Sequence, residues 1–130
     1  MTGTIVLDCD GLSKIVLNDR PTMALLTRAN IDGLRIVASA ATLVEARDPR
    51  IGQARFDWAI SRLVIEPVTE DIARAASKLL AAHRRHGHRH AIDAMVAATA
   101  LAAPAPRLLL TSDAEDLARL CGETVRIVAA

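Results

Sequence analysis

Five short apolar runs alternate along this chain with longer segments that carry helix start and stop signals. The runs cover residues 5–7, 34–37, 63–65, 108–110 and 125–128. Strands of a parallel sheet are buried on both faces and therefore read as continuous apolar runs. Strands that alternate with helices form a parallel sheet with helices on both faces. The pattern predicts an α/β fold in which helices sandwich a central parallel sheet of four to five strands.

Capping residues mark the expected helices. Ser39 is expected to cap a helix over 40–46, and Thr69 a long helix that begins with acidic residues. Ser112 and the glutamate three residues later have the form of a capping box, which opens a helix that Gly122 closes. An alanine-rich helix is expected over 91–103, after a basic loop around Gly87.

The chain is expected to form one domain over residues 1–130. This length is short for two domains, and a hydrophobic content of 52% supports a sizeable core. No apolar stretch approaches the length of a membrane span, and no signal peptide begins the chain. Cys9 and Cys121 are too few for a disulfide framework. These features predict a cytoplasmic protein without a membrane partner.

Charge and aromatic content restrict the classes of nucleic-acid binding. The net charge is +1, but 14 of the 16 basic residues are arginine, which suits forked contacts with phosphate. Phe56 and Trp58 are the only aromatic residues. A protein that stacks bases on aromatic platforms is therefore not expected. The two aromatics are expected to pack on the core or to anchor a partner.

Carboxylates follow the expected strands. Asp8 comes directly after the first strand, and Asp113 and Asp116 come after the fourth. Asp93 lies in the first turn of the alanine-rich helix, and Glu45 lies on a helix face expected to be partly buried. In open parallel sheets, ligands bind outside the carboxyl ends of the strands. We therefore expect these side chains to meet at one edge of the sheet.

Such a cluster repels itself at neutral pH, and a hard divalent cation relieves the repulsion. Oxygen ligands alone suit Mg²⁺ or Mn²⁺. A site of this kind supports hydrolysis of a phosphodiester. Each acid taken alone also has a structural explanation, because Asp is common at helix caps and in first turns.

Four motifs in order resemble the PIN domain family, and the length resembles that of VapC-type toxins of type II toxin–antitoxin pairs. The motifs are Asp8 after strand one, Thr-Leu-Val-Glu-Ala around Glu45, Ile-Asp-Ala-Met-Val around Asp93, and Thr-Ser-Asp-Ala-Glu-Asp-Leu from Thr111. The resemblance implies the PIN-like fold and an endoribonuclease that depends on Mg²⁺ or Mn²⁺. It also implies an RNA substrate, a cognate antitoxin that inhibits the enzyme, and a homodimer.

The resemblance also assigns roles to residues. Asp8, Glu45, Asp93 and Asp113 would be the catalytic, metal-binding acids. Asp116 would be a further acid at the rim, and Thr111 a hydroxyl that orients ligands or substrate. Asp10 departs from the family pattern, which usually has a small hydroxyl residue there. Asp10 could join the metal shell.

Two other functions remain open at this stage. Leu-Asp-Cys-Asp-Gly-Leu also resembles the first motif of haloacid-dehalogenase-type phosphatases. That mechanism needs a lysine near the nucleophile, and the chain has only Lys14 and Lys78, neither at a strand end. A non-catalytic PIN-like binding module that holds a partner's arginine in an acidic pocket is the other alternative.

The run over 83–90 alternates histidine with arginine. We expect Arg84, Arg85 and Arg89 to position RNA phosphates beside the acids. A zinc or nickel site is the alternative that closely spaced histidines suggest, although the interleaved arginines repel a cation. A solvated loop without a function is a third interpretation.

Overall fold

The computed structural model describes residues 3–46, 48–84 and 87–130, without the side chains of 87–89. Within these residues a five-stranded sheet forms the centre of the protein, and each neighbouring pair of strands is parallel. In spatial order the strands are β3 (Val64–Glu66), β2 (Leu34–Ser39), β1 (Gly3–Leu7), β4 (Arg107–Thr111) and β5 (Arg126–Ala129). The predicted α/β class and the parallel sheet are confirmed.

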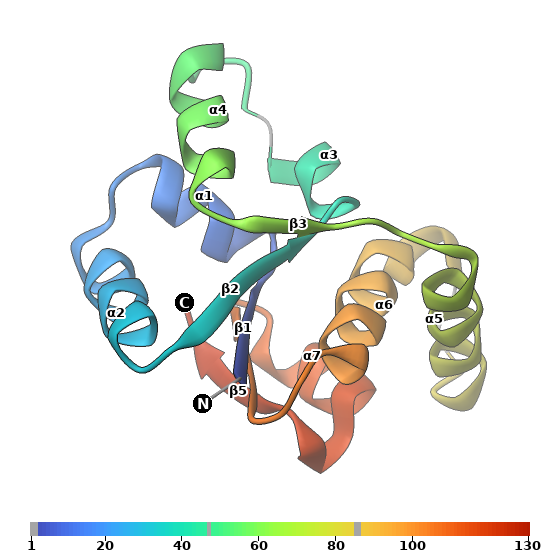
Figure 1. Ribbon diagram of the computed structural model, residues 1–130. Coiled ribbons are helices and arrows are strands. Elements are labelled where there is room, and N and C mark those ends of the chain that lie inside the picture. The colour runs from blue at the N-terminus through green and yellow to red at the C-terminus, as the bar shows by residue number, and fades with distance from the viewer. Residues whose placement is uncertain (1–2, 47, 85–86) are drawn as a thin grey trace.

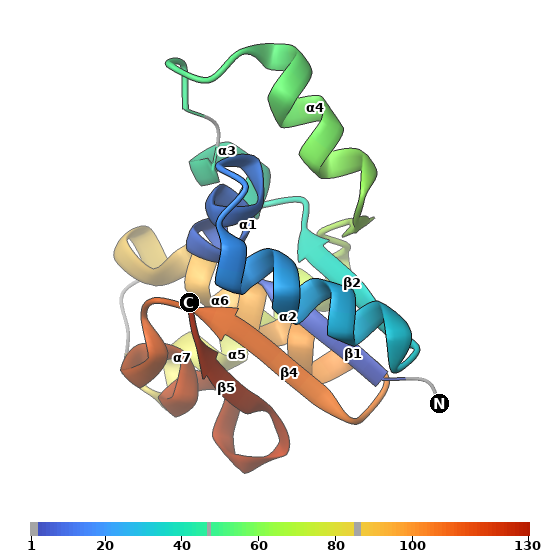
Figure 2. The same ribbon diagram turned by 90° about the vertical axis from the view of Figure 1, so that its left-hand side faces the viewer.

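Helices cover both faces of the sheet (Figures 1 and 2). In chain order they are α1 (Cys9–Val16), α2 (Arg20–Ile31), α3 (Thr42–Ala46), α4 (Gln53–Ser61), α5 (Glu70–Ala82), α6 (Gly87–Ala102) and α7 (Ala114–Cys121), followed by a 3₁₀ turn, η1 (Gly122–Thr124). Helices α1 to α4 lie on one side of the sheet and α5 to α7 on the other. Among the residues that the structure describes, none of the helices combines the length and apolarity that crossing a membrane requires.

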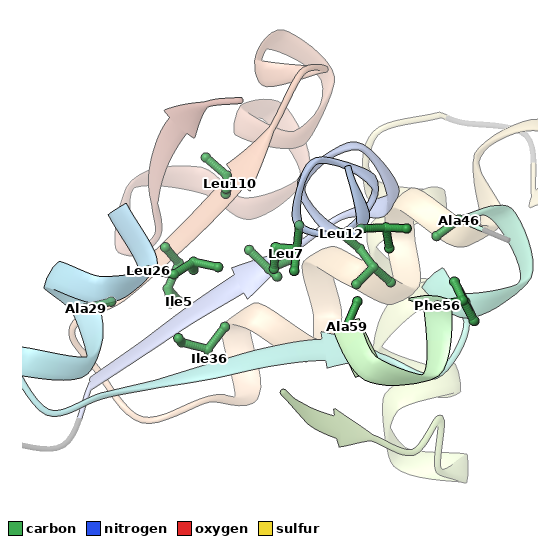
Figure 3. Packing of buried hydrophobic residues seen from close by; sticks show 12 residues of the cluster. Ile5, Leu7, Leu12, Leu26, Ala29, Ile36, Ala46, Phe56, Ala59 and Leu110 are labelled. Carbon is green, nitrogen blue, oxygen red and sulfur yellow. The ribbon is translucent and has the colours of Figure 1, made fainter. Parts of the chain in front are cut away.

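Alternate residues of each central strand face opposite layers of helices. In β1, Ile5 and Leu7 pack against α1 and α2, whereas Val6 between them packs against α6 and α7. Figure 3 shows the first of these clusters, in which Phe56 of α4 also lies. Because both faces are covered, the central strands carry apolar side chains at successive positions, which explains their continuous apolar runs.

The order of the sheet places a topological switch between β1 and β4. From β1 the chain proceeds to β2 and β3 on one side, and then returns to β4 and β5 on the other. The helices that follow β1 and β4 therefore begin on opposite faces and leave the carboxyl ends of these two strands uncovered between them. Ligands of open α/β proteins bind at this position.

Three local predictions about helix starts were wrong. Helix α6 begins at Gly87, four residues before the expected start, because nothing between Gly87 and Ala91 breaks a helix. Ser39 is the last residue of β2, and its hydroxyl accepts a hydrogen bond from Ala41 N at 3.2 Å rather than capping α3 directly. Asp113, not Ser112, is the N-cap residue of α7, and it makes no side-chain capping bond.

Replacing Leu12 of α1 with alanine should lower the free energy of unfolding by about 3 kcal/mol, because a buried leucine leaves a cavity. Leu12 is 0% exposed in the cluster of Figure 3. Leu17 at the end of the same helix is 67% exposed, so Leu17→Ala should cost less than about 0.5 kcal/mol. Urea unfolding followed by circular dichroism measures both variants. An equal loss of unfolding free energy in the two variants would contradict the burial of Leu12 in the core.

Candidate active site

Asp8 lies at the switch between β1 and β4. It follows the last residue of β1 and is the N-cap of α1, with its Oδ1 accepting a hydrogen bond from Gly11 N at 3.0 Å. Its Oδ2 accepts a hydrogen bond from the Thr111 hydroxyl at the end of β4. The structural explanation of Asp8 as a helix cap is therefore correct, and the same carboxylate also joins the two strands on either side of the switch.

The Thr111 hydroxyl connects two of the expected site residues. It donates to Asp8 and accepts a hydrogen bond from Asp113 N at 2.9 Å. Thr111 is fully buried and Asp8 is 5% exposed, so this connection lies under the surface of the site. The hydroxyl therefore fixes the Asp8 carboxylate relative to the backbone of Asp113.

Burial raises the pKa of the Asp8 carboxyl above its ordinary value. The hydrogen bonds from Thr111 and Gly11 act in the opposite direction, and the nearby charge of Asp10 raises the pKa further. The N-terminal end of α1 also favours a carboxylate at this position. Asp8 is thus a buried carboxylate held by hydrogen bonds, and no basic side chain within the described residues pairs with it.

Asp93 shows that carboxylates from separate parts of the chain lie near one another. Burial raises its pKa from 3.8 to about 6, and four other carboxylates contribute to the rise. In decreasing order these are Asp113, Glu45, Asp8 and Asp116. Asp93 lies in the second turn of α6, since the helix begins earlier than expected. The charges of four other acids that the sequence singles out thus act on Asp93, and their convergence on one cation stays a prediction.

Glu45 differs from its prediction. Its side chain is exposed rather than partly buried, because α3 is a five-residue helix that turns Thr42 and Ala46 toward the interior. Cys9 lies beside it: burial, followed by a hydrogen bond with Glu45, raises the pKa of the Cys9 thiol to about 12. A thiol with so high a pKa is a poor nucleophile.

The remaining acids lie in the segments that follow β1 and β4 and begin α1 and α7. Asp113 is exposed, and Asp116 is partly buried with an oxygen 3.8 Å from Arg119 Nη1. Asp10, in the first turn of α1, accepts a hydrogen bond from the Ser112 hydroxyl. The sequence pattern missed Ser112, because its position before an acidic helix start suggested a cap. Only the pairing of β1 with β4 reveals its contact with Asp10.

The basic run is described only in part. Arg84 is exposed in the turn between α5 and α6 and has a positive φ of 54°. Arg85 lies outside the described residues, as do the side chains of His88 and Arg89. The backbone of Arg89 is in the first turn of α6, four residues before Asp93.

The donor set fits a hard divalent cation. Within the described residues, no salt bridge joins Asp8, Glu45 or Asp93 to a basic side chain. Clustered carboxylates without a cationic partner are costly, and oxygen atoms are the preferred ligands of Mg²⁺ and Mn²⁺. No three carboxylate, histidine or cysteine side chains of the described residues stand close enough to hold an ion as they are. A bound cation would have to draw the carboxylates together.

Comparison with known proteins gives a family and a fold. Residues 5–123 match the family model of the PIN domain. Among solved structures, the chain is similar to a chain of VapBC2 from Rickettsia felis bound to a DNA fragment from their promoter, with a TM-score of 0.68, 13% sequence identity and 98% of each chain covered. The curated proteins contain no match.

Thr111→Val should lower the free energy of unfolding by roughly 1–3 kcal/mol, because the buried Asp8 carboxylate loses the hydrogen bond to its Oδ2 and keeps only the one from Gly11 N. Thr99→Val is the matched control. Thr99 is also buried, but its hydroxyl only donates to Met95 O within α6, at 2.8 Å, so its replacement should cost less than about 1 kcal/mol. Urea unfolding compares the two, and a Thr111→Val variant as stable as Thr99→Val would contradict the connection.

Asp93→Asn should raise the melting temperature of the metal-free protein by roughly 3–6 °C at about pH 7.5. This corresponds to about 1 kcal/mol after allowance for solvent screening of a partly exposed group. The folded pKa of about 6 exceeds the ordinary 3.8, so the free energy of unfolding falls as pH rises from about 4 to about 6. Above that range Asp93 is charged and the repulsion is complete.

Near pH 4, where Asp93 is largely protonated in the folded protein, Asn and Asp should give similar melting temperatures. Differential scanning calorimetry in a chelator measures both conditions. A gain of equal size at both pH values, or no gain at about pH 7.5, would show that the charge of Asp93 is not the cause.

Proposed function

Because the chain belongs to the PIN domain family, whose members are generally nucleases, we propose that it is a divalent-metal-dependent endoribonuclease, the toxin of a type II toxin–antitoxin pair. The observation that carries the proposal is the set of carboxylates around Asp93, whose charges add to the effect of burial and raise its pKa to about 6. Repulsion of this kind suits a site that binds a cation and a phosphodiester, and it has no role in a purely structural helix cap.

Asp8, Glu45, Asp93 and Asp113 would hold Mg²⁺ or Mn²⁺, with Asp116 at the rim. When bound, the cation activates water and offsets the charge that develops on the attacking and leaving oxygens of the phosphodiester. The chain's own contribution is to keep the ligands in place. Thr111 holds the Asp8 carboxylate and the Asp113 backbone through one hydroxyl, and α6 carries Asp93 on a rigid element.

Arginines at the start of α6 would position the RNA strand. Arg84 is exposed in the turn that leads to α6, and Arg85 and Arg89 follow it in the sequence. Arginine forms forked contacts with phosphate oxygens, which carry no sequence information but fix the strand relative to the site. These contacts predict cleavage that weakens as salt concentration rises.

A protein partner is part of the proposal. The similar structure is a VapBC2 assembly bound to promoter DNA. By analogy, this chain would pair with a cognate antitoxin that inhibits it, and would form a homodimer. A cytoplasmic location, where RNA is the substrate, completes the proposal.

Two other functions have less support. In a haloacid-dehalogenase-type phosphatase, Asp8 would be the nucleophile, but both of its oxygens accept hydrogen bonds, from Gly11 N and Thr111. Lys14 lies in the last turn of α1 and Lys78 is exposed in α5, so neither is at the carboxyl end of a strand. A non-catalytic binding module would use the same acids to hold a partner's arginine, and it would show no cleavage.

The purified chain should cleave single-stranded RNA in Mn²⁺ or Mg²⁺ and should stop when a chelator is added. Asp93→Asn should lower cleavage by at least about 100-fold, since it removes a ligand charge. Asp57→Asn is the control, because Asp57 is exposed on α4, where it accepts a hydrogen bond from Gln53 at 2.8 Å. Cleavage should increase with pH through about 6, the pKa of Asp93, because protons compete with the metal.

Full RNA cleavage by Asp93→Asn, or cleavage that persists in the chelator, would contradict the proposal. Release of phosphate from a small ester with RNA left intact would instead favour the phosphatase.

A further inference from the structure

Two carboxylate–hydroxyl pairs join the start of α1 to the loop between β4 and α7. The first is Asp8 with Thr111, and the second is Asp10 with Ser112. The two carboxylates are two residues apart on one segment, and the two hydroxyls are adjacent on the other. The proposed function uses the first pair directly, because Asp8 is a proposed ligand. It leaves the second pair without a role.

The loop that carries Ser112 has few other restraints. Strand β4 ends at Thr111, and α7 begins at Ala114. Asp113 between them is exposed, has φ −107° and ψ 56°, and gives α7 no side-chain capping bond. The backbone N–H of Asp113 donates a hydrogen bond to the Thr111 hydroxyl at 2.9 Å. The contact of Ser112 with Asp10 is therefore the bond that ties the middle of this loop to a different element.

Asp10 is well placed to act as the fixed end of this contact. It is partly buried in the first turn of α1, where the helix dipole favours a carboxylate. Helix α1 is anchored in turn by Leu12 and Ile15, which are 0% and 1% exposed. A hydroxyl that donates to an ionised carboxylate makes a stronger bond than one between neutral groups. A rigid helix thus holds a loop residue adjacent to Asp113.

We propose that Asp10 is a positioning residue and not a metal ligand: through Ser112 it fixes the loop that presents Asp113 to the site. The role of Asp113 rests on the proposed function, whereas the restraint of the loop rests on the contacts alone. The carboxylate of Asp10 suits this role because Ser112 supplies the hydroxyl that donates to it.

Two measurements on the metal-free and Mn²⁺-loaded chain test this assignment. Hydrogen–deuterium exchange without metal, followed over residues 111–117, reports the restraint of the loop between β4 and α7. Calorimetric titration with Mn²⁺ reports the consequence for metal binding. The variants are Asp10→Ala, Ser112→Ala, the double variant, and Asp10→Asn. Asp57→Ala is the control for loss of an exposed carboxylate on α4.

Asp10→Ala and Ser112→Ala should each speed exchange in the loop and weaken Mn²⁺ binding roughly tenfold, as loss of a residue that orients a ligand does. The double variant should show no faster loop exchange and no weaker Mn²⁺ binding than either single variant, because each single substitution already removes the same hydrogen bond. Asp10→Asn should stay within about twofold of the parent, because its amide oxygen still accepts the Ser112 hydrogen bond. Asp57→Ala should match the parent.

Asp10→Asn binding Mn²⁺ as weakly as Asp10→Ala, with Ser112→Ala unchanged, would make Asp10 a ligand and overturn the proposal. Unchanged loop exchange in Asp10→Ala and Ser112→Ala would also overturn it. If the parent chain binds no Mn²⁺ while loop exchange follows the expected order, the proposed function fails and the positioning role of Asp10 stands.

Discussion

The hydrogen bond between the Thr111 hydroxyl and the Asp8 carboxylate crosses the one place in this sheet where the strand order reverses. At that place two neighbouring strands send their helices to opposite faces, so their carboxyl ends stay open to a ligand. Asp8 satisfies its other oxygen with the first turn of α1. The buried carboxylate of Asp8 therefore joins the end of β4 to the start of α1. The other acids lie on the segments around it.

The unfavourable electrostatic energy of this arrangement is clearest at Asp93. Its pKa of about 6 reflects burial and the negative charges of Asp113, Glu45, Asp8 and Asp116, which come from the segment before α7, from α3, from the residue after β1 and from α7. No salt bridge among the described residues offsets the charge of Asp8, Glu45 or Asp93. A carboxyl whose pKa is raised by burial and by specific neighbouring charges is a candidate for a functional site. The proposed chemistry thus depends on a cluster of carboxylates that the metal-free fold tolerates at a cost in stability.

The sequence predicts the sheet well, because each central strand is apolar on both faces and needs no distant information to be recognised. It also places Asp8 and Asp113 just after two neighbouring strands, where the structure has them. That these acids hold a common cation stays a prediction. It fails where a contact joins residues far apart in the chain. Ser112 resembles a helix cap locally, yet it binds Asp10, 102 positions away. Glu45 appears buried from its apolar neighbours, but the shortness of α3 leaves it exposed.

The most direct test of a cation among these carboxylates is the anomalous scattering of Mn²⁺ in crystals of the chain soaked with the ion. The account predicts an anomalous peak between Asp8 and Asp93, with carboxylate oxygens at about 2.0–2.4 Å, and with Glu45 and Asp113 drawn toward it. A peak remote from Asp8 and Asp93, or none at saturating Mn²⁺, would contradict the account.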